Sequence, residues 1–269
     1  MSGHQTTINK SDKLKGVCYD IRGPVLREAH RLEDEGHRVI KLNIGNPAPF
    51  GFEAPEELLQ DVIHNLPDST GYCHSKGLFP ARKAVMQYTQ TKGIENVTVD
   101  DIIIGNGVSE LIVMAMQALL NYGDEVLLPA PYWTTYPECI ALAGGTTVVL
   151  QTDVVSGFRV TVDQLEAART AHTKALFFVS PSNPSGAAYT EGDLKALTDV
   201  LMKHPQVWVM TDDIYEHVIY DDFEFSTVAQ VEPGLKDRTL TLNGMSKAFC
   251  MTGWRVGFAA GPKELIKPI

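Results

Sequence analysis

The fold class is decided by KALFFVS (174–180), EGDLKALTDVLMKH (191–204) and VWVMTDD (207–213), which follow one another along the chain. The first and third stretches are apolar and have the length of strands, while the second has the length and periodicity of a helix. Apolar strands that are joined by a helix indicate a parallel sheet with both faces covered. We therefore expect an α/β protein.

The same alternation extends on both sides of this unit. Two further helices are expected at SELIVMAMQALLNYG (109–123) and VDQLEAARTA (162–171). The additional strands are expected at DIIIGN (101–106), EVLLPA (125–130), TTVVLQ (146–151), TLTLNG (239–244) and VGFAAGP (256–262). The pattern predicts a mostly parallel seven-stranded sheet sandwiched by helices, in which the last strand follows a short connection and runs antiparallel.

The N-terminal part has a different organisation. The segment PVLREAHRLEDEG (24–36) places Val25, Leu26, Ala29 and Leu32 on one face of a short helix. A strand is expected at VIKLNIG (39–45), and the proline-rich loop NPAPFGFEAP (46–55) marks a domain junction. We expect residues 1–52 to form an N-terminal arm and part of a small domain, and residues 53–269 to form the large domain.

Composition excludes several classes of function. The net charge is −10 and no block of Lys or Arg is present, which argues against nucleic-acid and anionic-membrane partners. No window approaches the roughly 18 apolar residues of a membrane span, and the polar N-terminus does not resemble a signal peptide. The spacing of Cys18, Cys73, Cys139 and Cys250 suggests neither a metal site nor disulfides. The chain is expected to be cytoplasmic.

Polar residues follow several of the expected strands, at the edge where α/β sheets bind ligands. The turn GNGVS (105–109) leads directly into a helix whose free N-H groups suit a phosphate, although Ser109 could also be an ordinary helix cap. Trp133 could cover a flat ring or only pack. Asn183, in the turn PSNPSG (181–186), offers an amide at the mouth of the fourth strand.

Charged residues follow the fifth and sixth strands. Asp212 is placed at a buried strand end, where a carboxylate needs a partner such as a protonated pyridine nitrogen. Asp213 points to the opposite side, where a helix cap or a surface ion pair is expected. Lys247 lies in a Gly/Ser turn where desolvation would make its amine nucleophilic, and Arg255 offers a fork for a phosphate.

In chain order these residues resemble the class I aminotransferases of pyridoxal 5'-phosphate (PLP) fold type I. The resemblance covers essentially the whole chain and is most specific in NPSG (183–186), TDDIYEHVIY (211–220) and SKAFCMTGWRVGF (246–258). It implies that Lys247 forms a Schiff base with PLP and acts as the general acid and base, and that Asp212 pairs with the pyridinium nitrogen. The remaining cofactor contacts that it implies are Asn183 and Tyr215 to the 3'-oxygen, Trp133 stacked on the ring, and Val108, Ser109, Ser246 and Arg255 to the phosphate.

The resemblance also implies a homodimer and a substrate site. Tyr72, in GYCHSKGLFPAR (71–82), matches a tyrosine that reaches the phosphate of the neighbouring subunit. Gly45, in LNIGNPAP (42–49), matches a glycine whose backbone meets the substrate carboxylate, and Tyr19 matches a residue that borders the substrate. Trp133 and Asn183 complete the implied substrate contacts.

The substrate and the completeness of the site stay open at this stage. Residues 14 to about 130 resemble bacterial alanine aminotransferase and the later half resembles bacterial aspartate aminotransferase, and we favour alanine with 2-oxoglutarate. Family members continue beyond the seventh strand with a long helix, most of the small domain and an arginine that binds the substrate carboxylate, so this chain is expected to be truncated. The alternatives are an aspartate aminotransferase, a PLP-dependent lyase on the same fold, a PLP-sensing regulator domain and an inactive remnant.

Overall fold

The computed structural model describes residues 11–12 and 23–269. The chain divides into two compact units, Met1–Ile44 and Gly45–Ile269. In the first unit the expected helix is present as α1 (Gly23–Asp34), and Arg31 bonds Glu28 one turn earlier at 2.7 Å. The division of the complete protein near residue 52 stays a prediction.

The prediction of a strand over residues 39–45 is wrong. Its residues have no strand assignment, and the side chains of Ile40 and Leu42 are 63% and 83% exposed. An isolated extended segment leaves its N-H and C=O groups without the cross-strand bonds that hold a strand. An apolar pattern alone therefore does not make a strand where the described residues offer no neighbour to pair with.

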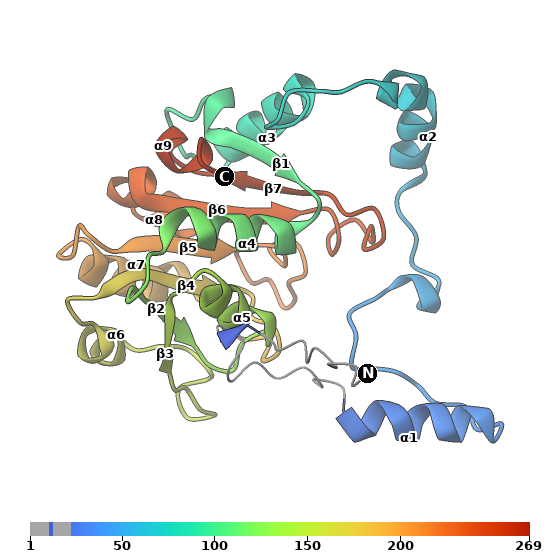
Figure 1. Cartoon of the computed structure of the whole chain (residues 1–269), viewed down its shortest axis with the longest axis horizontal. Helices are drawn as coiled ribbons and strands as arrows, with labels where there is room; N and C mark the ends of the chain where they lie inside the picture. The colour runs from blue at the N-terminus through green and yellow to red at the C-terminus, as the bar shows by residue number, and fades with distance from the viewer. Residues whose placement is uncertain (1–10, 13–22) are drawn as a thin grey trace, which may run out of the picture. The chain divides into compact units, whose positions relative to one another are not determined.

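The second unit is built on one seven-stranded sheet, and all seven expected strands are confirmed. The strand order is β1-β7-β6-β5-β4-β2-β3 (Figure 1). Pairs among β2 to β6 are parallel, and β7 is antiparallel to both of its neighbours, as expected. The bounds are β1 (Ile102–Gly105), β2 (Glu125–Pro129), β3 (Thr146–Leu150), β4 (Thr173–Val179), β5 (Trp208–Asp212), β6 (Thr239–Gly244) and β7 (Gly257–Ala260).

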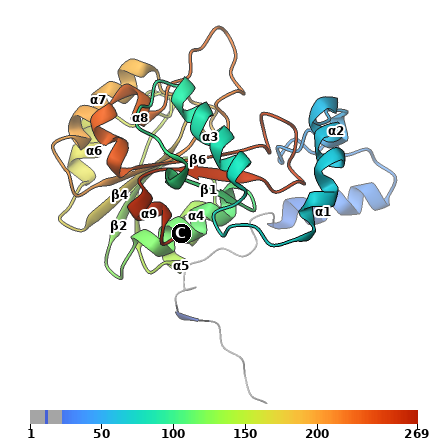
Figure 2. The same cartoon turned by 90° about the horizontal axis from the view of Figure 1, so that it is seen from above.

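Helices cover both faces of this sheet, which confirms the α/β class. Figure 2 shows α4 and α5 on one face and α3, α6, α7 and α8 on the other. The longer helices are α2 (Glu56–Asn65), α3 (Phe79–Thr91), α4 (Val108–Leu119), α5 (Thr135–Leu142), α6 (Val162–Ala168) and α7 (Glu191–Leu201). Two single-turn helices are α8 (Val228–Val231) and α9 (Lys263–Ile266), and short 3-10 helices are η2 (Ala48–Phe50), η3 (Leu66–Thr70), η4 (Val99–Asp101) and η5 (Pro233–Arg238). Among the described residues, the structure contains no helix with the length and apolar character of a membrane span.

Two apolar layers hold the helices to the sheet. On the first face Ile112 and Met116 of α4 pack with Phe177 of β4 in one buried cluster. On the second face Leu194 of α7 packs with Val209 of β5 in another. Burial of such side chains is worth about 1.5–3 kcal/mol each, so the sheet is a rigid base for whatever projects from its edges.

Several of the expected site residues lie at one edge of the sheet, the edge formed by the carboxyl ends of the parallel strands. Parallel pairing sets Val179 of β4 opposite Asp212 of β5, and Asp212 opposite Leu242 of β6. The chain segments that carry Asn183, Asp212 and Lys247 therefore leave three adjacent strands at the same edge. Because β7 is antiparallel, its first residue Gly257 pairs with the last residue of β1 and brings Arg255 to this edge too.

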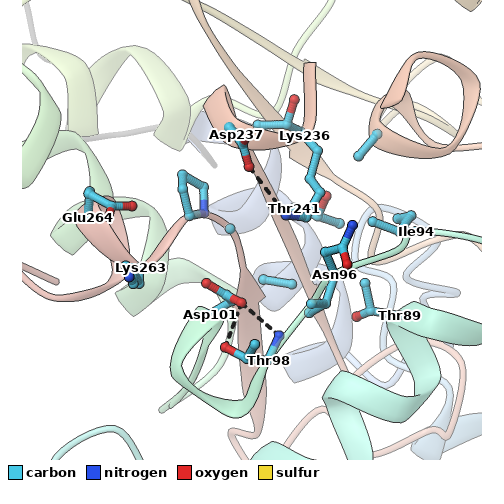
Figure 3. A pocket seen from close by; sticks show the side chains of 16 residues that line it. Thr89, Ile94, Asn96, Thr98, Asp101, Lys236, Asp237, Thr241, Lys263 and Glu264 are labelled. Carbon is cyan, nitrogen blue, oxygen red and sulfur yellow. Dashed lines mark hydrogen bonds and ion pairs between the residues drawn. The ribbon is translucent and has the colours of Figure 1, made fainter. Parts of the chain in front are cut away.

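A cavity of about 270 Å³ lies at the opposite edge (Figure 3). Its lining includes Asp101 just before β1, Thr239 at the start of β6 and Ala260 at the end of β7. Thr98 and Asp101 hydrogen-bond each other there, as a helix cap. The cavity is therefore separated by the length of the strands from the edge that carries Lys247.

Candidate active site

Asp212, the last residue of β5, is a buried carboxyl with a fixed orientation. Its Oδ2 accepts a hydrogen bond from the Tyr136 hydroxyl at 2.9 Å, and its Oδ1 accepts one from the Ile214 N-H at 3.2 Å. Burial raises its pKa to about 6, although both hydrogen bonds and the Lys247 charge act in the opposite direction. A carboxyl in this environment is stabilised as an anion by any further cation that approaches it.

Tyr136 holds Asp212 in place and was not identified from the sequence. Burial, followed by the Asp212 charge, raises its pKa well above the usual value, so the hydroxyl stays a donor. Its ring lies 4.5 Å from that of Phe177 and 5.4 Å from that of Trp133, both edge to face. The only signal in the sequence is an aromatic residue three positions after Trp133, on the helix that follows β2.

Tyr215 and Asn183 form a second pair at this edge. The Asn183 Nδ2 donates to the Tyr215 hydroxyl at 3.3 Å. Burial raises the pKa of Tyr215, and the Asp212 charge adds to the effect. A neutral phenol and an amide thus stand together where the chain leaves β4 and β5, and both can donate to an oxygen atom of a ligand.

The Lys247 amine lies near Tyr215 and within the electrostatic range of Asp212. Its Nζ donates to the Gly45 carbonyl at 2.8 Å and lies 5.9 Å from the centre of the Tyr215 ring. Burial lowers the pKa of Lys247, the Arg255 charge lowers it further, and Asp212 opposes both. More of the amine is therefore neutral near pH 8 than in a surface lysine, which is what a nucleophilic amine requires.

A candidate anion cradle, formed by Gly107, the start of α4 and Arg255, lies near the lysine. Gly107 precedes the first turn of α4 with a φ of +83°, and a Cβ added there would lie 2.5 Å from Nη2 of Arg255. The guanidinium therefore lies directly against the N-terminus of a three-turn helix, where free N-H groups and the helix dipole favour an anion. Val108, the first residue of α4, is buried, and so is Ser246 in the turn that carries Lys247.

Ser109 is not the helix cap that was the alternative for this turn. The cap position is Gly107, and Ser109 lies inside the first turn. Glu110 instead accepts the Asn106 N-H at 2.6 Å. The Ser109 hydroxyl thus does not cap the start of the helix, and its role toward a ligand stays a prediction.

We expect Gly107→Ala to weaken phosphate binding at this cradle by about tenfold, roughly 1.4 kcal/mol, because the methyl group would displace Arg255 and a non-glycine residue is strained at this φ. Gly253→Ala is the matched control, since a Cβ there meets no atom within 4 Å. Isothermal titration with pyridoxal phosphate measures both variants. Equal affinity of the two would contradict the cradle.

The other expected residues fall into three groups. Trp133 is half-buried against Tyr136, and Gly45 contacts Lys247, so both lie at this edge. Tyr72 is fully exposed and is not brought to the site within this chain. Tyr19 lies outside the described residues. The prediction of a surface ion pair for Asp213 is wrong, because Asp213 is only 2% exposed, and the helix-cap alternative is wrong too, because Asp213 is not the cap residue of any described helix.

Comparison with known proteins identifies the family. Residues 37–269 match the model of aminotransferase class I and II. Glutamate-pyruvate aminotransferase AlaA of Escherichia coli (strain K12) is 49% identical over 262 residues, which cover 97% of this chain and 64% of that protein. Aspartate/prephenate aminotransferase of Cereibacter sphaeroides is 46% identical over 258 residues, which cover 96% and 64%.

A solved structure gives the same result. The crystal structure of an aminotransferase from Escherichia coli has a TM-score of 0.91 and 47% sequence identity, over 98% of this chain and 66% of that one. The chain belongs to the class I and II aminotransferase family, which confirms the resemblance found in its motifs. It spans 64% of the length of AlaA.

Proposed function

We propose that this chain binds pyridoxal 5'-phosphate through Lys247 and takes part in the transfer of an amino group between an amino acid and a 2-oxo acid. The observation that carries the proposal is the meeting of three groups at one sheet edge: the half-buried Lys247 amine, the buried Asp212 carboxyl, and Arg255 against the start of α4. Such a set offers one partner each for an aldehyde, a pyridine nitrogen and a phosphate.

The residues fit this cofactor chemically. Asp212 is buried with a raised pKa of about 6, so a cationic ring nitrogen would satisfy its charge. A Cβ at Gly107 would lie 2.5 Å from Nη2 of Arg255, so the absence of a side chain lets the guanidinium approach the start of α4, where a phosphate could bind both. The phosphate contacts proposed are Val108, Ser109, Ser246 and Arg255, with Asn183 and Tyr215 at the 3'-oxygen and Trp133 against the ring.

The bound cofactor would supply an electron sink for the carbanion that forms when a substrate Cα loses its proton. The protein must then move protons, and the proposed group is Lys247 Nζ, whose pKa is lowered by burial and by Arg255. Asp212 keeps its orientation through Tyr136 while this occurs. Tyr215 stays protonated, because its pKa is raised, and it can donate a hydrogen bond throughout.

Alanine and glutamate are the proposed amino donors, with pyruvate and 2-oxoglutarate as the acceptors. The likeness to a glutamate-pyruvate aminotransferase, at 49% identity, supports this choice over aspartate, for which the corresponding relative is 46% identical. The substrate contacts proposed are Gly45, Trp133 and Asn183, together with Tyr19. Aspartate is the second candidate, since an aspartate/prephenate aminotransferase is nearly as similar.

A homodimer is proposed as the working form. The Tyr72 side chain is fully exposed in this chain, as expected for a residue that completes the phosphate site of a neighbouring subunit. The cytoplasmic location stays a prediction.

The test combines cofactor attachment with a donor screen. The chain is incubated with pyridoxal phosphate, reduced with borohydride and digested, and we expect the cofactor mass on the Lys247 peptide and not on that of the exposed Lys203. Turnover is then followed with alanine, glutamate or aspartate and a 2-oxo acid. Label spread evenly over surface lysines would refute the binding proposal, whereas ammonia release without an oxo acid would indicate a lyase.

A further inference from the structure

Glu216 is a buried carboxylate just beyond the candidate site, and it is only 4% exposed. It accepts hydrogen bonds from the Tyr88 hydroxyl, the Lys92 ammonium and, at 2.6 Å, the Asn243 amide. A buried charge costs several kcal/mol unless it is paired and fully hydrogen-bonded. This carboxylate has the partners that its burial requires, and they come from two segments that are distant in the chain, α3 with the residue after it and β6.

The two oxygens of Glu216 serve different partners. Oε1 accepts from Tyr88 and Asn243, while Oε2 accepts from Lys92, which directly follows α3. His217 also lies near, with its Nε2 2.7 Å from the Tyr88 hydroxyl. Burial, followed by the bond to Glu216, raises the pKa of Tyr88, so the phenol remains a donor. Glu216 and its hydrogen-bond partners Tyr88, Lys92 and Asn243 form one network, and one end of this network is anchored on α3.

The other end reaches the strand that leads to Lys247. Asn243 is buried and lies next to the end of β6, and its Nδ2 donates to Glu216. Its Oδ1 accepts the N-H of Gly244 at 2.7 Å. A Cβ at Gly244 would lie 2.7 Å from the Val256 carbonyl, so the turn that begins here is tightly packed. The Asn243 side chain thus fixes the first peptide of the turn that carries the lysine.

Glu216 itself is tied to the strand that carries Asp212. Its N-H donates to the Asp213 carbonyl at 2.9 Å, and the Asp213 N-H donates to the Leu242 carbonyl at 2.8 Å. The ends of β5 and β6 are therefore joined once through the backbone and once through the Glu216 side chain. Asp212 and Lys247 emerge from these two ends, and each alters the pKa of the other.

We propose that Glu216 is a positioning residue, which fixes the Gly244–Lys247 turn relative to Asp212 by accepting the amide of Asn243. The ion pair with Lys92 anchors Glu216 but does not itself reach the turn. The part of Glu216 that acts on Lys247 is therefore Oε1, the oxygen that accepts from Asn243. The inference deepens the proposed function, because it concerns the amine to which that function assigns the cofactor.

Two double variants separate the acceptor atom from the charge. Lys92→Met/Glu216→Gln, called the Met/Gln variant, removes the ion pair and keeps an amide oxygen for Asn243 and Tyr88. Lys92→Met/Glu216→Met, called the Met/Met variant, removes the ion pair and that oxygen together. Both replace a buried ion pair with neutral side chains of similar volume, a change that proteins often tolerate. Asn243→Ala breaks the same link from the other side and serves if the Met/Met variant does not fold.

The readout is the pH dependence of Lys247 acetylation under competitive trace labelling, measured by peptide mass on the whole chain without pyridoxal phosphate. We expect the midpoint for Lys247 in the Met/Met variant to move upward, toward that of Lys203, because a relaxed turn lets water and counter-charges reach the amine. The Met/Gln variant should keep the wild-type midpoint. The acetylation midpoint of Lys203 should be the same in all variants.

Two results would overturn the proposal. One is an unchanged Lys247 midpoint in both the Met/Met variant and Asn243→Ala. The other is an equal shift in both double variants, which would assign the effect to the charge. The labelling needs no cofactor. Failure of pyridoxal phosphate to bind would therefore refute the proposed function without changing what the Lys247 midpoints say about Glu216.

Discussion

Lys247→Ala is expected to lower transamination by about 10⁴-fold, the upper end of what a positioned acid-base group contributes. The Lys247 amine has the two properties that the reaction needs: a pKa lowered first by burial and then by Arg255, and a position beside Asp212 and Tyr215. An alanine methyl group can neither attach the cofactor nor carry a proton. Initial rates with alanine and 2-oxoglutarate measure the loss.

The control for this substitution is Lys203→Ala, which removes an exposed lysine outside the candidate site. It should leave the rate within about twofold, because surface changes of this kind have small effects. Thermal unfolding of all three proteins checks that the fold is kept. If Lys247→Ala retained a tenth of the wild-type rate, the proposed role of the lysine would be wrong.

The sheet edge could be anticipated from the sequence because apolar runs reveal strands, and polar residues that follow them must lie at strand ends. Asn183, Asp212 and Lys247 could be placed at this edge without knowledge of strand order. Their placement depends only on local periodicity and on the shared direction of parallel strands. The expected strand at 39–45 failed for the complementary reason, since pairing depends on a partner that periodicity does not reveal.

Side-chain partners that are distant in the chain were not accessible in this way. Tyr136 bonds Asp212 across 76 positions, and Asn243 bonds Glu216 across 27. Both contacts arise only after β4, β5 and β6 are aligned and the helices are packed on them. The prediction of a surface position for Asp213 failed for a related reason. Alternation along a strand tells which residues share a side, but it does not tell whether the second side faces solvent or packs against α3 and its neighbours.

Asp212 and Asp213 form a matched pair for a second test, because they are adjacent, both buried and differ in what they face. Asp212→Asn is expected to lower turnover by about 10³-fold, since a neutral amide cannot hold a cationic ring nitrogen. Asp213→Asn should keep turnover within about threefold, because its carboxyl points away from the Lys247 side of the strand. Rates of the two variants with alanine measure the difference, and similar losses in both would contradict the assignment of Asp212.

Asp213→Asn should instead change how stability depends on pH. Burial raises the pKa of Asp213 to about 7, against the charge of Lys92, whereas an unfolded aspartate titrates near 3.9. Between these values the folded chain holds a proton that the unfolded chain has released, so this carboxyl makes folding less favourable as the pH rises from about 4 to about 7. Asparagine has no proton to lose and is free of this effect.

The free energy of unfolding of Asp213→Asn, relative to wild type, should therefore increase from pH 4 to pH 8 by at most about 4 kcal/mol, since one pKa unit corresponds to about 1.4 kcal/mol. Urea unfolding of both proteins at the two pH values measures the change. The opposite sign would mean that Lys92 holds Asp213 as an anion and that burial is not the dominant effect. In that case the ammonium would be shared by Asp213 and Glu216, and the anchor of the Glu216 network would include both carboxylates.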